Sequence, residues 1–175
     1  LPVDSTRLPN ISPMTLLPAD FVARYARPPS PTTVSQAVSI HENVRALLGD
    51  TEYATFLQGS YKNDTALWDM NDVAIVAVSR GLVSSVFTGR SGANGVPWTE
   101  IFDRIERKLQ SDARYQGKWK REDKCIRLNT GVKIDIVPAV YISDATSDPI
   151  AIFSFRSGRE RQNWPRQHYD AGTAK

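Results

Sequence analysis

Residues 53–60 read YATFLQGS and residues 72–78 read DVAIVAV, and these two apolar runs decide the fold. The first run predicts a strand over 53–58. The second predicts a strand over 72–78 that is apolar on both faces, as in the centre of a covered sheet. Gly59 lets the backbone approach a ligand closely, and a short helix expected over 60–65 would offer free N–H groups to phosphate oxygens. With the Ser60 hydroxyl and the Lys62 charge, the connection predicts a phosphate-holding turn.

Acidic residues stand at two places inside apolar runs. Asp72 opens the second run, and Asp135 is a lone acid within VKIDIV at 132–137. Burial of an unpaired carboxylate is costly, so an acid in such a place normally has a partner or a cation. Nucleotide transfer from a triphosphate needs Mg²⁺, which prefers oxygen ligands. Two acids at i and i+2 of a strand point to one face and can share metal ions. Position 74, however, holds alanine.

The rest of the chain predicts an α+β domain. Residues 1–30, with scattered prolines, read as an irregular arm with one short helix over 20–27, and residues 31–175 form the core. The expected core elements are a helix over 31–48, a glycine- and serine-rich loop over 80–96, a helix that begins near Thr99 and buries Ile101, Ile105 and Leu109, antiparallel strands over 119–128 and 132–140 with Gly131 in the turn, a strand over 150–155, and a basic tail with Arg156, Arg159, Arg161 and Arg166.

The composition of the chain bears on its expected ligands and its location in the cell. The chain has 175 residues, is 41% hydrophobic and 23% charged, and carries a formal net charge of +3. The mild positive charge fits an anionic small molecule or an RNA acceptor, and an ordinary basic surface is the alternative. The one cysteine, Cys125, allows no disulfide within the chain and fits the cytoplasm; a packed thiol is expected there. No run reaches membrane-spanning length, so no membrane partner is expected.

Three stretches together resemble the DNA polymerase beta-type nucleotidyltransferase superfamily, and more narrowly its bacterial cGAS-like (CD-NTase) branch. They are FLQGSYKNDT at 56–65, DVAIV at 72–76 and VKIDIVPA at 132–139. The segment NWPRQHY at 163–169 is similar to the one that leads into a C-terminal helical domain in that branch, so such a domain is expected to be missing here. The resemblance covers about Thr33 to Lys175.

The resemblance implies a mixed, mostly antiparallel sheet flanked by helices, a nucleoside triphosphate donor and two Mg²⁺ ions, with Mn²⁺ as an alternative. It implies that Asp72 and Asp135 bind metal, with Asp135 next to the attacking hydroxyl. It also implies a triphosphate site, which we assign to Gln58, Gly59, Ser60, Tyr61 and Lys62. The branch often makes cyclic or linear oligonucleotide signals in anti-phage defence. Nothing in the sequence selects a base, a product or an oligomeric state.

Ala74 departs from the pattern, because the family has an aspartate there that bridges both metal ions. The resemblance therefore implies a chain that transfers nucleotides poorly and still binds them. Two origins are open: a change introduced to silence the enzyme, which the otherwise intact strand favours, or a natural pseudoenzyme. Two rival functions also stay open, namely a toxin that modifies tRNA or protein, and a non-catalytic nucleotide-binding module.

Overall fold

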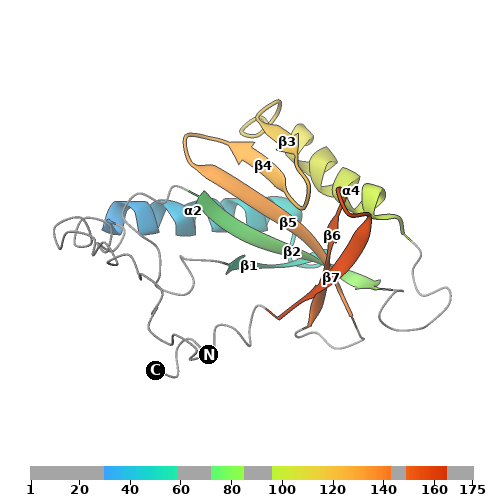
Figure 1. Cartoon of the computed structure of the whole chain (residues 1–175). Helices are drawn as coiled ribbons and strands as arrows, with labels where there is room; N and C mark the ends of the chain where they lie inside the picture. The colour runs from blue at the N-terminus through green and yellow to red at the C-terminus, as the bar shows by residue number, and fades with distance from the viewer. Residues whose placement is uncertain (1–29, 59–71, 85–95, 143–148, 165–175) are drawn as a thin grey trace, which may run out of the picture.

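A computed structural model describes residues 30–58, 72–84, 96–142 and 149–164 (Figure 1). Within these ranges the chain forms helices α2 (Pro31–Leu48) and α4 (Trp98–Ser111). The strands are β1 (Tyr53–Gln58), β2 (Asp72–Val83), β3 (Trp119–Arg121), β4 (Ile126–Asn129), β5 (Lys133–Tyr141), β6 (Ile150–Ser154) and β7 (Arg159–Asn163). None of the helices in the described ranges is long and apolar enough to cross a membrane.

The strands form one mixed sheet. Its main path runs β1-β2-β5-β4-β3, and the β6–β7 hairpin extends from β5. β2 and β5 are parallel, whereas the other described pairs are antiparallel. A parallel pair needs a long crossover, and here α4, β3 and β4 lie between the two strands in the chain. The mixed, mostly antiparallel sheet expected from the sequence is confirmed.

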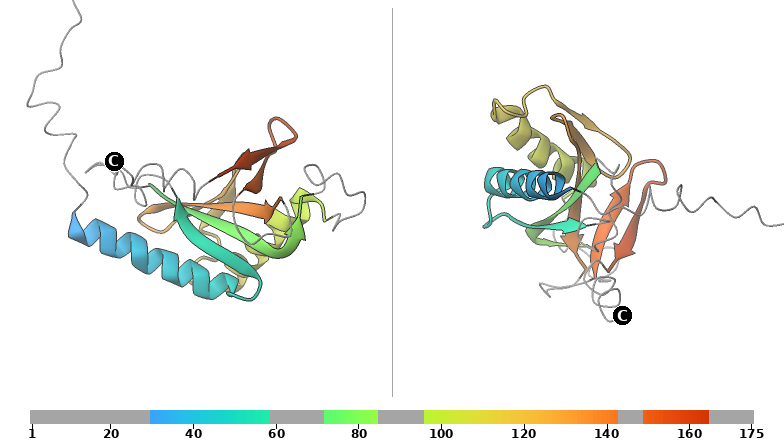
Figure 2. Two further views of the ribbon diagram at one scale, coloured as in Figure 1. Left: turned by 90° about the horizontal axis from the view of Figure 1, so that it is seen from below. Right: turned by 90° about the vertical axis from the view of Figure 1, so that its left-hand side faces the viewer.

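Both helices cover the same face of this sheet. In the right-hand view of Figure 2 they lie on one side, and β6 and β7 lie on the other. The core under the helices joins apolar residues of α2, α4, β2, β4 and β5. It contains, among others, Val44, Leu48, Ile75, Phe102, Ile105, Leu109, Ile126, Leu128, Ile134 and Ile136, all fully buried. A second cluster, which includes Val76, Val78 and Ala139, packs toward β6 on the opposite face.

Several sequence expectations are confirmed. α2, β1, β5 and β6 match the expected helix and strands, and α4 buries Ile101, Ile105 and Leu109 as expected, together with Phe102. Gly131 lies between β4 and β5 at φ 90°, a backbone conformation that glycine adopts without strain. The expected helices over 20–27 and 60–65 lie outside the described residues.

Three expectations about strands are wrong. β2 runs on to Val83, into the expected loop, because a register shift after Ser79 lets Val83 pair with Tyr141. The single strand expected over 119–128 is two strands, β3 and β4, joined by a turn in which the Glu122 N–H donates to the Cys125 carbonyl over 2.8 Å. The expected basic tail forms β7, which turns back onto β6 through Gly158 at φ 62°.

Phe102 ties α4 to the sheet and supplies a test of this packing. Its fully buried ring meets the Phe155 ring edge-on at 4.9 Å between centroids. Phe102→Ala should therefore lower the free energy of unfolding by about 3–5 kcal/mol, as measured by urea denaturation. Val38 on α2 is 48% exposed, so Val38→Ala should change it by less than about 0.5 kcal/mol. Equal effects of the two substitutions would contradict this core.

Candidate functional site: a cross-strand row on the open face

One row of residues crosses the face of the sheet that the helices leave open. Gln58 pairs with Ala74, Ala74 with Asp135, Asp135 with Arg127, and Arg127 with Lys120. Directly paired residues of neighbouring strands project from the same face. Four residues therefore lie side by side on this face: Gln58 of β1, Ala74 of β2, Asp135 of β5 and Arg127 of β4. Lys120 of β3 lies beyond Arg127. We call Gln58, Ala74, Asp135 and Arg127 the cross-strand row, and Lys120 lies just outside it.

Asp135 and Arg127 form a two-pronged ion pair within the row. Arg127 Nε donates to Asp135 Oδ1 over 2.8 Å, and Arg127 Nη2 donates to Asp135 Oδ2 over 2.9 Å. The Arg127 side chain is 39% exposed and the Asp135 side chain is 26% exposed, so the pair is only partly shielded from water. This hydrogen-bonded pairing raises the pKa of Arg127, which stays charged. Both carboxylate oxygens that the sequence assigned to metal are thus engaged by a guanidinium.

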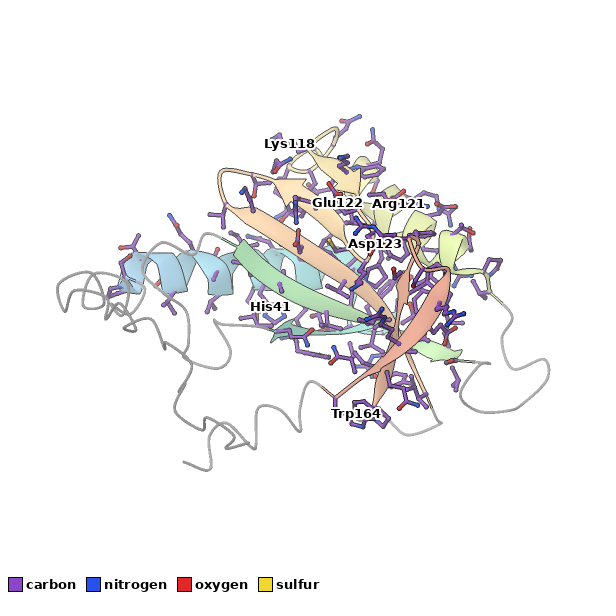
Figure 3. The ribbon with its side chains drawn as sticks, in the orientation of Figure 1. His41, Lys118, Arg121, Glu122, Asp123 and Trp164 are labelled. Carbon is purple, nitrogen blue, oxygen red and sulfur yellow. The ribbon has the colours of Figure 1, made fainter. Side chains whose placement is uncertain are left out.

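Sequence reasoning missed Arg127 as part of the site. Five basic residues lie close together in the sequence, but the structure divides them: Lys118, Lys120, Arg121, Lys124 and Arg127. Arg121 turns toward α4, where its Nε donates to Glu106 Oε1 over 2.6 Å and its guanidinium lies 5.5 Å from the Phe102 ring centroid. Figure 3 shows Arg121 at the β3–β4 turn beside α4. Arg121 therefore projects to the face that carries the helices, because it follows Lys120 on β3 and side chains alternate along a strand. Arg127 projects to the open face, where β4 pairs it with Asp135.

Asp72 stands two residues before Ala74 on β2, and the register pairs it with Lys133. The alternation of the strand puts positions 72 and 74 on the same face, as the sequence predicted. The side chain of Asp72 lies outside the described part of the structure, and so do Gly59, Ser60, Tyr61 and Lys62. Gln58 is described, and it ends β1 beside Ala74. The expected phosphate-holding residues therefore follow directly from one member of the row.

The described residues offer few metal ligands. Ala74 has no donor atom, and no group of three or more His, Cys, Asp or Glu side chains in the described ranges is arranged to hold a metal ion. Two Mg²⁺ ions need several carboxylate oxygens. In the described part of the row, Asp135 is the one acid, and its charge is already balanced by Arg127. As they stand, these residues do not fit a two-metal site.

Cys125 lies next to this ion pair, just before β4. It is a free, buried thiol. Burial raises the pKa of the thiol to about 12, and the nearby Asp135 carboxylate adds to this shift. The packed thiol expected from the sequence is confirmed. It has the opposite of the lowered pKa that a cysteine nucleophile needs.

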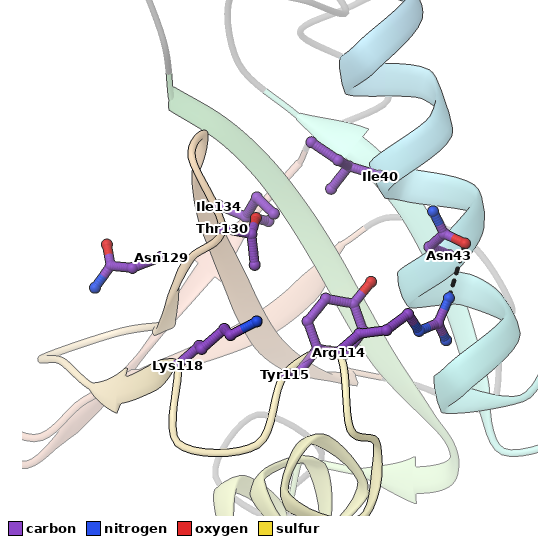
Figure 4. Close-up of a pocket in the computed structure, with 8 residues that line it drawn as sticks. All are labelled: Ile40, Asn43, Arg114, Tyr115, Lys118, Asn129, Thr130 and Ile134. Atoms are coloured by element: carbon purple, nitrogen blue, oxygen red, sulfur yellow. Dashed lines mark hydrogen bonds between the residues drawn. The ribbon is translucent and has the colours of Figure 1, made fainter.

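A cavity of about 430 Å³ opens elsewhere, on the face that carries the helices. Figure 4 shows its lining: Ile40, Asn43, Arg114, Tyr115, Lys118, Asn129, Thr130 and Ile134. Arg114 Nη1 donates to Asn43 Oδ1 over 3.0 Å and so links the loop after α4 to α2. Ile134 is the β5 neighbour of Asp135 but projects to the opposite face. The cavity is therefore separated from the cross-strand row by the sheet.

Solved structures share this architecture. A CdnE c-UMP-AMP synthase of Rhodothermus marinus, solved with Apcpp and Upnpp, is 24% identical with a TM-score of 0.63, over 91% of this chain and 60% of that chain. An Elizabethkingia meningoseptica CdnE cyclic dinucleotide synthase, solved with GTP and Apcpp, is 23% identical with a TM-score of 0.65, over 91% of this chain and 59% of that chain. The Bradyrhizobium diazoefficiens CD-NTase CdnG, in complex with GTP, is 20% identical with a TM-score of 0.62, over 84% of this chain and 42% of that chain.

These likenesses define the fold. The chain has the nucleotidyltransferase fold of the CD-NTases, which confirms the fold expected from the three sequence stretches. It spans 60% and 59% of the lengths of the two CdnE chains. No protein-family model matches the chain, and no curated protein matches its sequence.

The shielded thiol gives a direct test of the packing beneath the row. With a pKa of about 12, about one Cys125 in ten thousand is a thiolate at pH 8. Its reaction with a disulfide reagent at pH 8 should be at least about a hundredfold slower in the folded chain than in urea. Because Cys125 is the one cysteine, the released chromophore reports on it alone. Equal rates in both states would contradict its burial.

Proposed function

We propose that the chain is the nucleotide-binding core of a nucleotidyltransferase that moves a nucleoside monophosphate from a triphosphate to a hydroxyl. The observation that carries this proposal is the register of β2 with β5, which puts position 74 beside Asp135 on the open face. In the resembling family, both positions are acids of the active site. The proposed product is a cyclic or linear oligonucleotide signal in anti-phage defence. The free cysteine supports the cytoplasm as its location.

The proposed triphosphate site lies at the β1 end of the cross-strand row. Gln58 pairs with Ala74, so the backbone of Gly59 begins one residue, less than about 4 Å, from the row. Ser60, Tyr61 and Lys62 would then contact phosphates and sugar close to the acids. The CdnE and CdnG structures were solved with nucleoside triphosphates or their analogues, which supports a triphosphate as the ligand here.

Ala74 limits the proposed activity. With aspartate at this position, the row would present carboxylates on adjacent strands about 4.8 Å apart, which suit Mg²⁺. We therefore propose Mg²⁺ as the cofactor of the intact site, with Asp72 and Asp135 as further ligands and Mn²⁺ as a substitute. Since the described residues do not fit two ions, we assign no metal-dependent step to this chain as it stands.

A second candidate is a nucleotide-binding module without catalytic activity. The ion pair between Arg127 and Asp135 favours it, because the row is electrically balanced without a metal. In this candidate the chain binds a triphosphate and transfers nothing, even when an acid is placed at position 74.

The substitution Ala74→Asp tests these candidates. With α-labelled triphosphates and Mg²⁺, the variant should transfer label at least about a hundredfold faster than the parent chain, by analogy with loss of one transition-state contact. The assay separates small oligonucleotides from labelled RNA and labelled protein. Both chains should bind triphosphate in a calorimetric titration.

The outcomes separate the candidates. Small labelled oligonucleotides support a signal synthase, whereas labelled RNA or protein would point to a toxin-like transferase. Binding without transfer in either chain would leave the non-catalytic module. Absence of triphosphate binding in both chains would refute the proposed function.

A further inference from the structure

Arg127 binds Asp135, the carboxylate expected to bind a metal ion. Its two donors reach the two Asp135 oxygens over 2.8 Å and 2.9 Å. This parallel arrangement is the geometry in which a guanidinium matches a carboxylate best. A divalent ion at either Asp135 oxygen would compete with the guanidinium for the negative charge of the same carboxylate.

The residues on either side of the ion pair do not compete with Arg127 for Asp135. Lys120 lies beside Arg127 on β3, but its Nζ pairs with Glu122 Oε1 at 3.2 Å. On the other side of Asp135 stands Ala74, which supplies neither a charge nor a donor. Arg127 is therefore the cation held at Asp135, and Lys120 is a matched cation one strand away with a different carboxylate.

We propose that Arg127 is an internal cation that competes with divalent metal for Asp135. The proposal rests on the proposed function in one respect, since it takes Asp135 as an acid that faces the metal site. It assigns Arg127 a positioning role: the guanidinium engages both carboxylate oxygens of Asp135, so a divalent ion would meet an acid that is already paired. An acid restored at position 74 alone then recovers only part of the metal affinity.

The size of the effect follows from the exposure of the pair. Arg127 and Asp135 are 39% and 26% exposed, so water weakens their attraction. Loss of the guanidinium removes this competition and also a positive charge close to the incoming ion. An exposed charge pair alone corresponds to about 1.4- to fivefold. Because loss of the adjacent positive charge adds to this, metal binding should tighten about three- to tenfold.

The test measures Mn²⁺ binding without nucleotide, by the electron paramagnetic resonance signal of free Mn²⁺. The chain Ala74→Asp is the reference, because it restores the second acid. Adding Arg127→Met should lower the Mn²⁺ dissociation constant about three- to tenfold. Adding Lys120→Met instead removes the same charge one strand away, so it should change the constant less than about twofold. Asp135→Asn, added to the Arg127→Met chain, should abolish the gain.

Two results would overturn the proposal. One is an unchanged Mn²⁺ affinity, or no binding, in both the reference chain and its Arg127→Met derivative. The other is an equal gain from Lys120→Met, which would mean that net charge rather than the ion pair controls binding. If Arg127→Met fails to fold, Arg127→Lys keeps the charge and loses the fork, and should give a smaller gain of the same sign. Triphosphate binding in EDTA is measured separately, so failure here leaves the proposed function standing.

Discussion

The parallel pairing of β2 with β5 is the constraint on which the rest of the structure depends. It sets Ala74 against Asp135 and, through the antiparallel neighbours β1 and β4, aligns Gln58 and Arg127 with them. Because the pair is parallel, the chain must leave β2, cross the sheet and return, and α4 lies within this crossover. The same crossover delivers the apolar side of α4 to the core. One strand pairing thus organises both the core and the open face.

Side chains of the sheet balance one another's charges on the open face. A partly buried carboxylate needs a partner, and Arg127 supplies one for Asp135. Lys120 and Glu122 form a second pair at the same side of the sheet. An aspartate in place of Ala74 would add a negative charge on the adjacent strand and so increase the demand for a cation. The alanine and the arginine therefore act in the same direction, since both reduce the need for a metal ion.

The sequence predicts those elements whose local pattern is strong. The continuous apolar run of β2, the stripe Ile101, Ile105 and Leu109 of α4, and Gly131 in a turn all follow from period, burial and backbone freedom. β7 was missed because its five residues, RERQN, carry no apolar pattern, and only pairing with β6 makes them a strand. The break between β3 and β4 lies in and after KREDK at 120–124, a run of five charged residues without apolar alternation, which the single strand expected over 119–128 overlooks.

The site was partly predictable for the same reason. Asp72, Ala74 and Asp135 stand out because each interrupts or borders an apolar run, and strand alternation puts positions 72 and 74 on one face. Arg127 could not be assigned to Asp135 from sequence, because their contact depends on the register of β4 with β5. Within β3, neighbouring Lys120 and Arg121 project to opposite faces, and a charge cluster in sequence does not reveal this.

The cation at Asp135 on the open face is Arg127, and we propose that Arg127, rather than a divalent ion, stays there when a triphosphate binds. A crystal structure of the chain grown with Mn²⁺ and a non-hydrolysable triphosphate analogue tests it directly, with anomalous scattering measured at the manganese edge. We expect the analogue at the end of β1, the Arg127–Asp135 pair intact, and no manganese peak within bonding distance of Asp135. Two manganese peaks at Asp135 with Arg127 displaced would contradict it.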